Sequence, residues 1–334
     1  MEERINPPLF LYMKLGNLEI KGKVVLAPMA GITSLGYREF MGKYHPALFV
    51  TEMVSDMGII YQNKETLSYI IFPKSDIPTG VQLFGSNPEN LAKALLICEK
   101  TNQNIDFYDV NMGCPVNKVT KTGAGSALLK NPKLCGDIIR ALKKVTNKPV
   151  TAKIRLGWDS NSINFLEVIN ELENAGVDMI GIHARTTKQL YAGEPQYELL
   201  KNLRKKMNVP LAISGNIFTL NDAKRAMEIT GADMVMVARG GVGNPTLIEE
   251  INKDEIIDST LVEQINYCKD LARFYIKEKG EEVAMRIYRG IAPKFLSSFP
   301  RVKKVKTRLA MELHTYEDLE KILNDYLLEN TEGI

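Results

Sequence analysis

The chain has 334 residues, of which 45% are hydrophobic and 25% charged, which is the composition of a globular protein with a sizeable core. Its formal net charge of only +3 does not indicate a nucleic-acid partner, so local charge has to be considered instead. Four cysteines without a C-x-x-C pair, together with three histidines, argue against a zinc site and against a disulfide framework. We therefore expect a protein of the reducing cytoplasm that holds no metal.

The N-terminal stretch MEERINPPLFLYMKLG begins with acidic residues, and its apolar part is short and interrupted by prolines. We therefore expect no signal peptide. A membrane-spanning helix needs about 18 consecutive apolar residues. The chain contains no such run, so we expect no contact with a membrane.

Short apolar runs alternate with amphipathic helical patterns along most of the chain. The runs predict strands at 24–28, 47–51, 80–84, 107–111, 150–155, 179–183, 211–214 and 234–238. Helical patterns between them include 87–101, 132–146 and 162–175. Nearly continuous apolar strands are typical of parallel sheets that are buried on both faces. Eight strand–helix units of this kind predict an α/β fold, a (β/α)8 TIM barrel.

The alternative α/β fold is a doubly wound open sheet, whose fingerprint is G-x-G-x-x-G after the first strand. The first predicted strand leads into APMAGIT instead. Beyond residue 253 the pattern becomes helical only, over 261–279, 282–297, 302–311 and 316–330. We therefore predict a barrel domain at 1–253 and a small all-helical domain at 254–334.

Small or polar residues follow nearly every predicted strand, and active sites of barrels form at these strand ends. The two glycine-containing loops after the last two strands, SGNI and ARGGVGNP, indicate a phosphate site and hence a phosphorylated cofactor. Gln82 and Lys153 are placed to face the head group of that cofactor. A lysine there could stabilise negative charge on a reduced flavin.

The stretch NMGCPVNKVTKTGAGSALL places Cys114 between Gly113 and Pro115, which predicts a sharp turn that displays the thiol. A displayed thiol with a pKa near the free value of about 8.5 can act as a general acid. A small buried apolar residue is the other interpretation, and the pattern leaves both open. The remaining cysteines, at 98, 135 and 268, lie in helical patterns and are interpreted as packing residues.

These segments, with TEMVS, VQLFG, AKIRLGW and IHARTTKQLYAG in the same order, closely resemble the signature of the tRNA-dihydrouridine synthases, and most of all the bacterial B-type subgroup. The resemblance implies FMN-dependent reduction of uridine in tRNA to 5,6-dihydrouridine, with NADPH as the reductant. Hydride would pass from flavin N5 to C6, and Cys114 would give the proton to C5. The residues that match FMN contacts are Pro28, Met29, Ala30, Gln82, Lys153, His183, Ser214, Gly215, Asn216, Ala238, Arg239 and Gly240.

On the substrate side, Asn111 matches the residue that holds the target base, and Arg155, Arg185 and Tyr191 are further expected contacts. Residues 286–311 contain many basic side chains and no acidic one, which predicts a surface for RNA phosphates. The members we expect to bind tRNA are Arg286, Arg301, Lys303, Lys304 and Lys306. Lys118, Lys121, Arg185 and Lys188 would extend this surface over the barrel mouth. A solvated basic face is the alternative interpretation.

Two other functions remain open from the sequence. A flavin enzyme acting on a free pyrimidine would not need the basic helical domain, and a non-catalytic RNA-binding protein would not need Cys114. The sequence indicates no obligate protein partner, and it predicts neither the tRNA position that is modified nor the oligomeric state.

Overall fold

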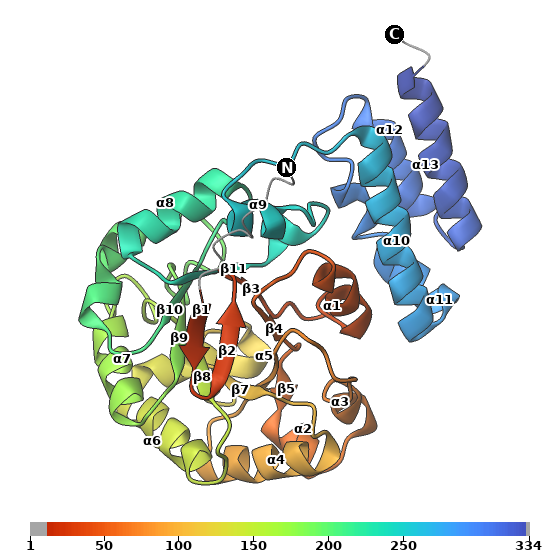
Figure 1. Ribbon diagram of the computed structural model, residues 1–334. Coiled ribbons are helices and arrows are strands. Elements are labelled where there is room, and N and C mark those ends of the chain that lie inside the picture. The colour runs from red at the N-terminus through yellow and green to blue at the C-terminus, as the bar shows by residue number, and fades with distance from the viewer. Residues whose placement is uncertain (1–11, 332–334) are drawn as a thin grey trace, which may run out of the picture.

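The fold is that of a computed structural model, which describes residues 12–331. Residues 1–11, which hold most of the stretch judged not to be a signal peptide, and residues 332–334 lie outside the described part. Figure 1 shows a barrel with a separate group of helices beside it. Within residues 12–331, no helix combines the length and the apolar character needed to cross a membrane.

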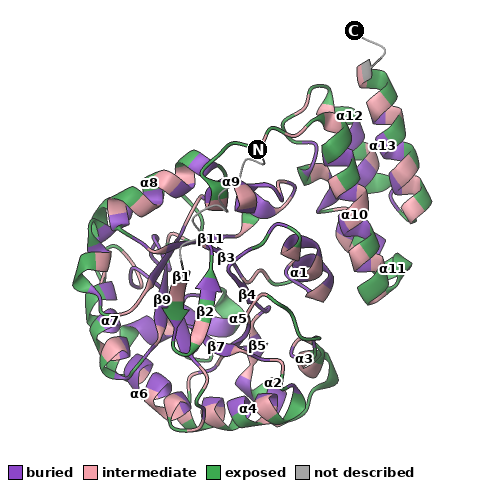
Figure 2. Ribbon diagram, viewed as in Figure 1, coloured by how far each residue is buried: buried purple, intermediate pink, exposed green. Residues whose placement is uncertain are grey.

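Parallel strands form a closed barrel, and the predicted TIM-barrel fold is thereby confirmed. The strands are β3 (Val24–Leu26), β4 (Leu48–Val50), β6 (Thr79–Phe84), β7 (Phe107–Asn111), β8 (Val150–Arg155), β9 (Met179–His183), β10 (Leu211–Ser214) and β11 (Met234–Val237). Pairing of β4 with β6 closes the sheet, which excludes the open-sheet alternative. The short strand β5 (Val54–Ser55) pairs with the end of β6. Figure 2 shows the barrel strands buried.

Helices surround the barrel and turn their exposed faces outward (Figure 2). They are α1 (Leu35–Gly42), α2 (Asp56–Ile60), α3 (Lys64–Ser68), α4 (Pro88–Thr101), α5 (Asn117–Thr120), α6 (Pro132–Lys143), α7 (Phe165–Asn174), α8 (Leu220–Thr230) and α9 (Leu247–Lys253). Short 3₁₀ helices lie at η1 (Gly125–Lys130), η2 (Tyr197–Leu200), η3 (Leu203–Lys206) and η4 (Arg239–Gly241). The connection from β9 to β10 therefore uses η2 and η3 in place of an α-helix.

An antiparallel hairpin of β1 (Tyr12–Leu15) and β2 (Leu18–Lys21) covers the N-terminal end of the barrel. Leu15 and Ile20 are fully buried there and pack in one cluster with Phe107 and Met179, the first residues of β7 and β9. The sequence analysis did not predict this hairpin. Because it closes one end of the barrel, the polar strand ends at the opposite end form the accessible face.

The C-terminal helices are α10 (Leu261–Lys279), α11 (Glu281–Tyr288), η5 (Ala292–Lys294), α12 (Val302–Met311) and α13 (Tyr316–Thr331). A capping box fixes the start of α10, since Thr260 and Glu263 each accept a backbone N–H from the other. The helix predicted over 282–297 is wrong in its second half. It ends at Tyr288 because Gly290 and Pro293 follow, and proline lacks the N–H that a continuing helix needs.

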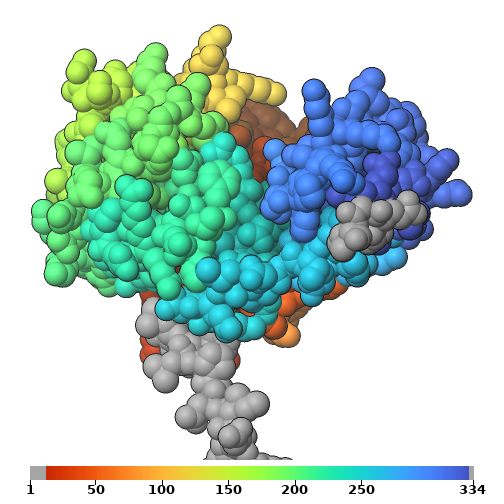
Figure 3. Space-filling view, turned by 90° about the horizontal axis from the view of Figure 1, so that it is seen from above, coloured from red at the N-terminus to blue at the C-terminus, as the bar shows by residue number. Residues whose placement is uncertain are grey.

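The space between the barrel and the C-terminal helices is a cleft of about 980 Å³. Figure 3 shows it as a hollow between the barrel and the blue helices. Its lining comes from both sides and includes Phe218 and Arg239 of the barrel and Lys294 and Phe299 of the helical part. The segment after α9, with Ile256 to Ser259, forms part of the same wall.

Candidate active site

Two adjoining cavities lie at the C-terminal ends of the barrel strands. The glycine-side cavity, of about 140 Å³, is bordered by the loops after β10 and β11. The cysteine-side cavity, of about 380 Å³, is bordered by the loop after β7. Pro28, Met29, Lys153, His183, Tyr191 and Arg239 line both cavities. Every residue that the sequence analysis assigned to the cofactor lines at least one of them.

The glycine-side cavity is built for close backbone approach. Gly215 has φ of +135°, and Asn216 follows in the left-handed region with φ of +45°. A Cβ on Gly240 would lie 2.0 Å from the carbonyl oxygen of Ile217, so only glycine fits between the two loops. Arg239 lies at the edge of this cavity. Small residues, open backbone and one cation are the features that a phosphate group requires.

A chain of buried side-chain hydrogen bonds runs beneath the cysteine-side cavity. Thr151 donates to Asp109 over 2.6 Å, Gln82 Nε2 donates to the other Asp109 oxygen over 2.6 Å, and Asn111 Nδ2 donates to Gln82 Oε1 over 2.8 Å. Alternate residues of β6, β7 and β8 face the barrel interior, which brings these groups together. Burial raises the pKa of Asp109. This series of hydrogen bonds fixes which amide atoms of Gln82 and Asn111 face each neighbour.

Asn111 also sets the shape of the turn that carries Cys114. Its Oδ1 accepts the backbone N–H groups of Gly113 and Cys114, over 3.1 and 2.8 Å. On the other side, Ser126 donates both its N–H and its hydroxyl to the carbonyl of Cys114. Cys114 itself is partly exposed and lines the cysteine-side cavity. Of the two interpretations that the sequence left open, the structure shows a partly exposed thiol, and Asn111 holds the cysteine turn.

The other cysteines have a different environment. Cys98, Cys135 and Cys268 are fully buried in α4, α6 and α10, as predicted. Burial raises the pKa of each of these thiols to about 12. They are therefore protonated and shielded from any substrate, which leaves Cys114 as the thiol at the cavity.

Lys153 lies beside Asn111 in the strand register and reaches both cavities. Burial, with help from the neighbouring Arg155 charge, lowers the pKa of its ammonium from 10.5 to about 8. Asp109 and Cys114 act in the opposite direction. The group is thus a cation at neutral pH that titrates just above it, in a place where negative charge on a bound molecule would be stabilised.

His183 at the end of β9 is a neutral hydrogen-bonding group. Burial and the surrounding cations, of which Lys153 and Arg155 contribute most, lower the pKa of its imidazole far below the usual value. Arg185 Nη1 lies 3.2 Å from Nε2, and a guanidinium can only donate, so Nε2 accepts and the ring proton is on Nδ1.

Arg185 and Arg155 hold loops together. The Arg185 guanidinium donates to the carbonyls of Ala192 and Gly193 and to Asn216 Oδ1. It is buried and does not line either cavity, so the expectation that it adds to the positive surface is wrong. Arg155 donates to the carbonyl oxygens of Gly113, Thr186 and Leu190, although it also lines the cysteine-side cavity.

Tyr191 stands over the site as an exposed aromatic side chain, with 58% of its surface accessible. Its ring centroid lies 5.6 Å from the Arg155 guanidinium and 5.1 Å from that of Arg239. The imidazole of His183 lies 6.1 Å away. This arrangement places the ring where it could cover a bound planar group.

The basic residues of 286–311 line neither cavity and differ among themselves. Lys304 forms an ion pair with Glu329 over 2.5 Å, and Arg308 pairs with Asp325 over 2.9 Å, so acidic residues of α13 offset part of the charge. Lys303 is exposed and forms no ion pair within residues 12–331. Arg286 is likewise exposed and unpaired in that range. Arg301, Lys303 and Lys304 border a shallow groove along α12.

Sequence reasoning missed two kinds of residue. Asp109 was not singled out, although a carboxylate inside an apolar strand such as FYDVN is itself a signal of a buried polar role. Phe218 was missed as well. It is an exposed aromatic after the SGNI loop, lines the glycine-side cavity and lies 5.6 Å from the Arg239 guanidinium.

A TIM barrel whose strand ends bring polar side chains, glycine loops and a partly exposed thiol to two adjoining cavities has the architecture of a barrel enzyme. The profile of the dihydrouridine synthase family matches residues 25–331. The tRNA-dihydrouridine synthase B of Pasteurella multocida is 32% identical over 89% of this chain and 93% of its own length. That of Vibrio cholerae is 34% identical over 82% and 87%. The chain therefore belongs to the dihydrouridine synthase family and is an oxidoreductase.

Solved structures add support for the fold. An old yellow enzyme homologue from Zymomonas mobilis superposes with a TM-score of 0.51, covering 77% of this chain and 96% of that chain at 13% identity. Histamine dehydrogenase from a Rhizobium species gives a TM-score of 0.55 over 80% of this chain and 51% of that chain, also at 13% identity. At such low identity these likenesses establish the barrel fold and nothing further.

Proposed function

We propose that this chain is a tRNA-dihydrouridine synthase that holds FMN, takes electrons from NADPH, and reduces the C5=C6 bond of uridines in tRNA. The observation that carries the proposal is the position of Cys114. Its partly exposed thiol lines the cavity that adjoins the glycine-side loops, while the other cysteines are buried. The names of the relatives, tRNA-dihydrouridine synthase B, point to the same substrate.

The residues of the two cavities suit FMN. Gly215, Asn216 and Gly240 offer backbone to a phosphate, and Arg239 adds a positive charge. Lys153 provides a cation for an electron-rich ring, and Gln82 an oriented amide. When bound, FMN would supply the hydride for the reduction.

The remaining steps belong to the chain itself. A uridine of folded RNA has to leave its stack to enter the cavity, and the exposed ring of Tyr191 offers it a surface for stacking. Asn111 and Ser126 hold the Cys114 turn in place, so that the thiol can deliver a proton to C5 of the base. Arg155 fixes the loops on either side of the entrance. A tRNA substrate is consistent with the cytoplasmic location that we expect.

Replacement of the proton donor tests this proposal. We expect Cys114→Ala to lower dihydrouridine formation on unmodified tRNA by at least about 100-fold, the usual contribution of a general acid, while FMN binding is kept. Mass spectrometry of tRNA nucleosides measures the product, and the flavin absorbance measures the cofactor. Cys135→Ala is the matched control, because Cys135 is buried away from the cavity. A normal rate in Cys114→Ala would remove the proton-donor assignment.

The same assay on tRNA from cells identifies which uridine of the tRNA is modified. Bulk tRNA from cells with and without the gene should differ in dihydrouridine, and mapping the missing modification gives the specificity. The competing function is a flavin enzyme for a free pyrimidine. It predicts that the purified protein reduces the free base and leaves tRNA unchanged.

A further inference from the structure

The loop after β3, residues 28–34, forms the wall that the two cavities share. Pro28 and Met29 line both cavities, and Ala30 lines the cysteine-side cavity. Ile32 borders the cysteine-side cavity and also the cleft toward the helical part. Any movement of this loop therefore changes the shape of the proposed FMN site.

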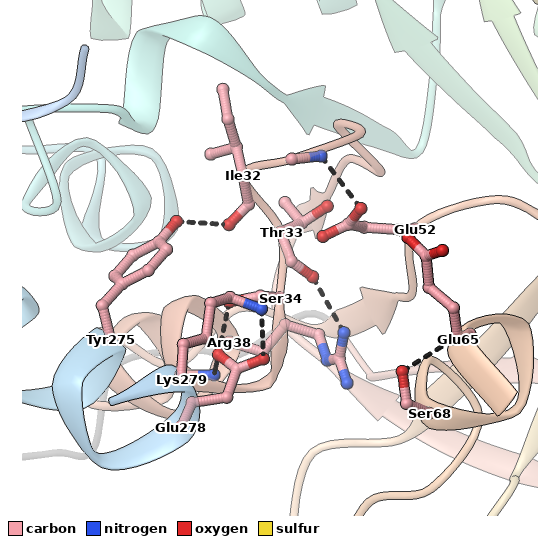
Figure 4. A network of polar contacts seen from close by, with 12 residues as sticks. Ile32, Thr33, Ser34, Arg38, Glu52, Glu65, Ser68, Tyr275, Glu278 and Lys279 are labelled. Atoms are coloured by element: carbon pink, nitrogen blue, oxygen red, sulfur yellow. Dashed lines mark hydrogen bonds and ion pairs between the residues drawn. The ribbon is translucent and has the colours of Figure 1, made fainter. Parts of the chain in front are cut away.

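The barrel holds one half of this loop. Thr33 Oγ1 accepts the N–H of Met29 over 2.7 Å, which ties the loop to itself. Gly31, with φ of +76°, donates its N–H to Glu52 Oε2 over 2.9 Å, and Arg38 donates to the carbonyl of Thr33 over 2.8 Å. Figure 4 shows Glu52 and Arg38 directed at the loop.

Helix α10 of the C-terminal part holds the other half. The hydroxyl of the fully buried Tyr275 donates to the carbonyl of Ile32 over 2.7 Å. Glu278 Oε2 accepts the Ser34 hydroxyl over 2.6 Å and the Gly36 N–H over 2.8 Å. In Figure 4 both side chains reach from α10 to this segment. A Cβ on Gly36 would lie 2.7 Å from the carbonyl oxygen of Phe274, so α1 and α10 touch through their backbones.

We propose that Tyr275 and Glu278 are positioning residues that fix the 28–34 loop, so that the helical part shapes the cofactor site as well as offering its basic surface to RNA. This proposal rests on the proposed function in one respect, namely that the molecule bound in the two cavities is FMN. The hydrogen bonds join segments that are far apart in sequence, since Tyr275 and Ile32 are separated by 243 positions. The loop wall is thus complete only when α10 is docked.

Truncation of the chain would therefore affect more than RNA binding. If the helical part served RNA alone, deleting the residues after about 255 would abolish tRNA binding and leave the flavin chemistry intact. Because α10 bonds to Ile32, Ser34 and Gly36, the truncated barrel would also lack part of its cofactor site. Loss of activity in such a truncation does not distinguish a tRNA substrate from a free pyrimidine.

The test uses the full chain with Tyr275→Phe and, separately, Glu278→Ala. Hydrogen–deuterium exchange over peptides covering 28–36 reports the loop without any cofactor. Titration of the apo protein with FMN, followed by flavin fluorescence, reports the site. Since one hydrogen bond contributes about 1 kcal/mol, or roughly a fivefold change in an equilibrium, we expect exchange and the FMN Kd to rise about fivefold or more. Affinity for tRNA in the absence of FMN should stay within about twofold, because the exposed basic side chains are unchanged.

Two controls keep the result specific. Tyr326→Phe removes an equivalent buried hydroxyl, which donates to the carbonyl of Pro300 inside the helical part, and should leave the loop unchanged. Glu278→Gln keeps an acceptor and should restore most of the protection that Glu278→Ala removes. Unchanged exchange over 28–36 in both Tyr275→Phe and Glu278→Ala would overturn the inference. Failure of the unaltered chain to bind FMN would overturn the proposed function instead, while the exchange measurement would still decide the role of α10.

Discussion

Lys153 is an amine in a place where charge is costly. Burial lowers its pKa to about 8, so the folded chain binds this proton less tightly than the unfolded chain does. The penalty is present in full below pH 8, where the group is charged in both states. It disappears as the pH rises from about 8 to the ordinary value of about 10.5. The buried position of Lys153 therefore lowers the stability of the folded chain at neutral pH.

We accordingly expect Lys153→Met to raise the free energy of unfolding of the apo protein at pH 7 by about 1–3 kcal/mol. The gain should shrink toward pH 10, because the unaltered lysine is then neutral in the folded state. Urea unfolding at the two pH values measures both quantities. The same variant should bind FMN more weakly. A variant that is less stable than the unaltered chain at pH 7 would contradict this interpretation of Lys153.

Local chemistry made the turn at Cys114 predictable from the sequence, whereas exposure and burial of its thiol both stayed open. Gly113 and Pro115 define the turn that exposes it, and the helical patterns around the other cysteines indicated burial. The sequence analysis assigned Asn111 to the substrate and not to the turn, and the bond of its amide to Gln82 depends on the pairing of two strands. The buried position of Arg185 was hidden for a similar reason, since its partners lie in three different segments.

Among the elements, the loops after β10 and β11 pack so closely that their contact leaves no room for an added side-chain atom. In Gly240→Ala, the new methyl group would meet the Ile217 carbonyl, and one loop would have to move by about 1 Å to relieve the overlap. We expect FMN to bind at least about tenfold more weakly, because displacements of this size remove aligned contacts. Titration of the apo protein measures the change.

Gly42→Ala is the control for that variant. The added Cβ would lie 3.6 Å from the ring of Phe49, which is ordinary contact, and the residue is at the end of α1. Its FMN affinity should match that of the unaltered chain. Equal affinity in Gly240→Ala would mean that the two loops separate without cost to the site.

The eight barrel strands were predictable to within two residues because their apolar runs match the burial of a parallel barrel. Helices α10 and α12 have the predicted bounds, since capping and glycine residues mark the ends of α10 and a proline precedes α12. The η2 and η3 segments were not predicted, because tertiary packing decides between one helix and two short turns. The division at residue 253 coincides with the end of α9, and the two-domain organisation itself stays a prediction.

At the scale of the molecule, the basic residues divide into those that form an ion pair with an acidic side chain and those that do not. We expect Lys303→Glu combined with Arg286→Glu to weaken tRNA binding and to reduce the salt dependence of log K by about 0.7–0.9 for each phosphate that is no longer neutralised. Lys304→Glu should weaken binding less, because Glu329 already offsets the charge of Lys304. Binding measured over a series of salt concentrations separates these cases.

Lys14→Glu is the control for the charge reversals, since Lys14 is exposed on β1 at the opposite end of the barrel. It alters net charge without touching the expected RNA surface. Equal salt dependence in the double variant and in this control would contradict an RNA surface on the helical part. The pairing of Lys304 and Arg308 with α13 could not be predicted from the sequence, because it depends on how α12 and α13 pack.

The hairpin of β1 and β2 bears on the order of events in the proposed reaction. Leu15 and Ile20 seal the lower end of the barrel, so a molecule can reach the buried cavities through the upper mouth. If the nicotinamide reductant and the flipped uridine of the proposed reaction share that mouth, they have to take turns, and the reduced enzyme must wait between the two visits. Initial rates measured against both reactants should give parallel lines in double-reciprocal plots. Such an enzyme holds the electrons between its reactions with the two reactants. Its absorbance spectrum during turnover therefore shows which of the two reactants is limiting.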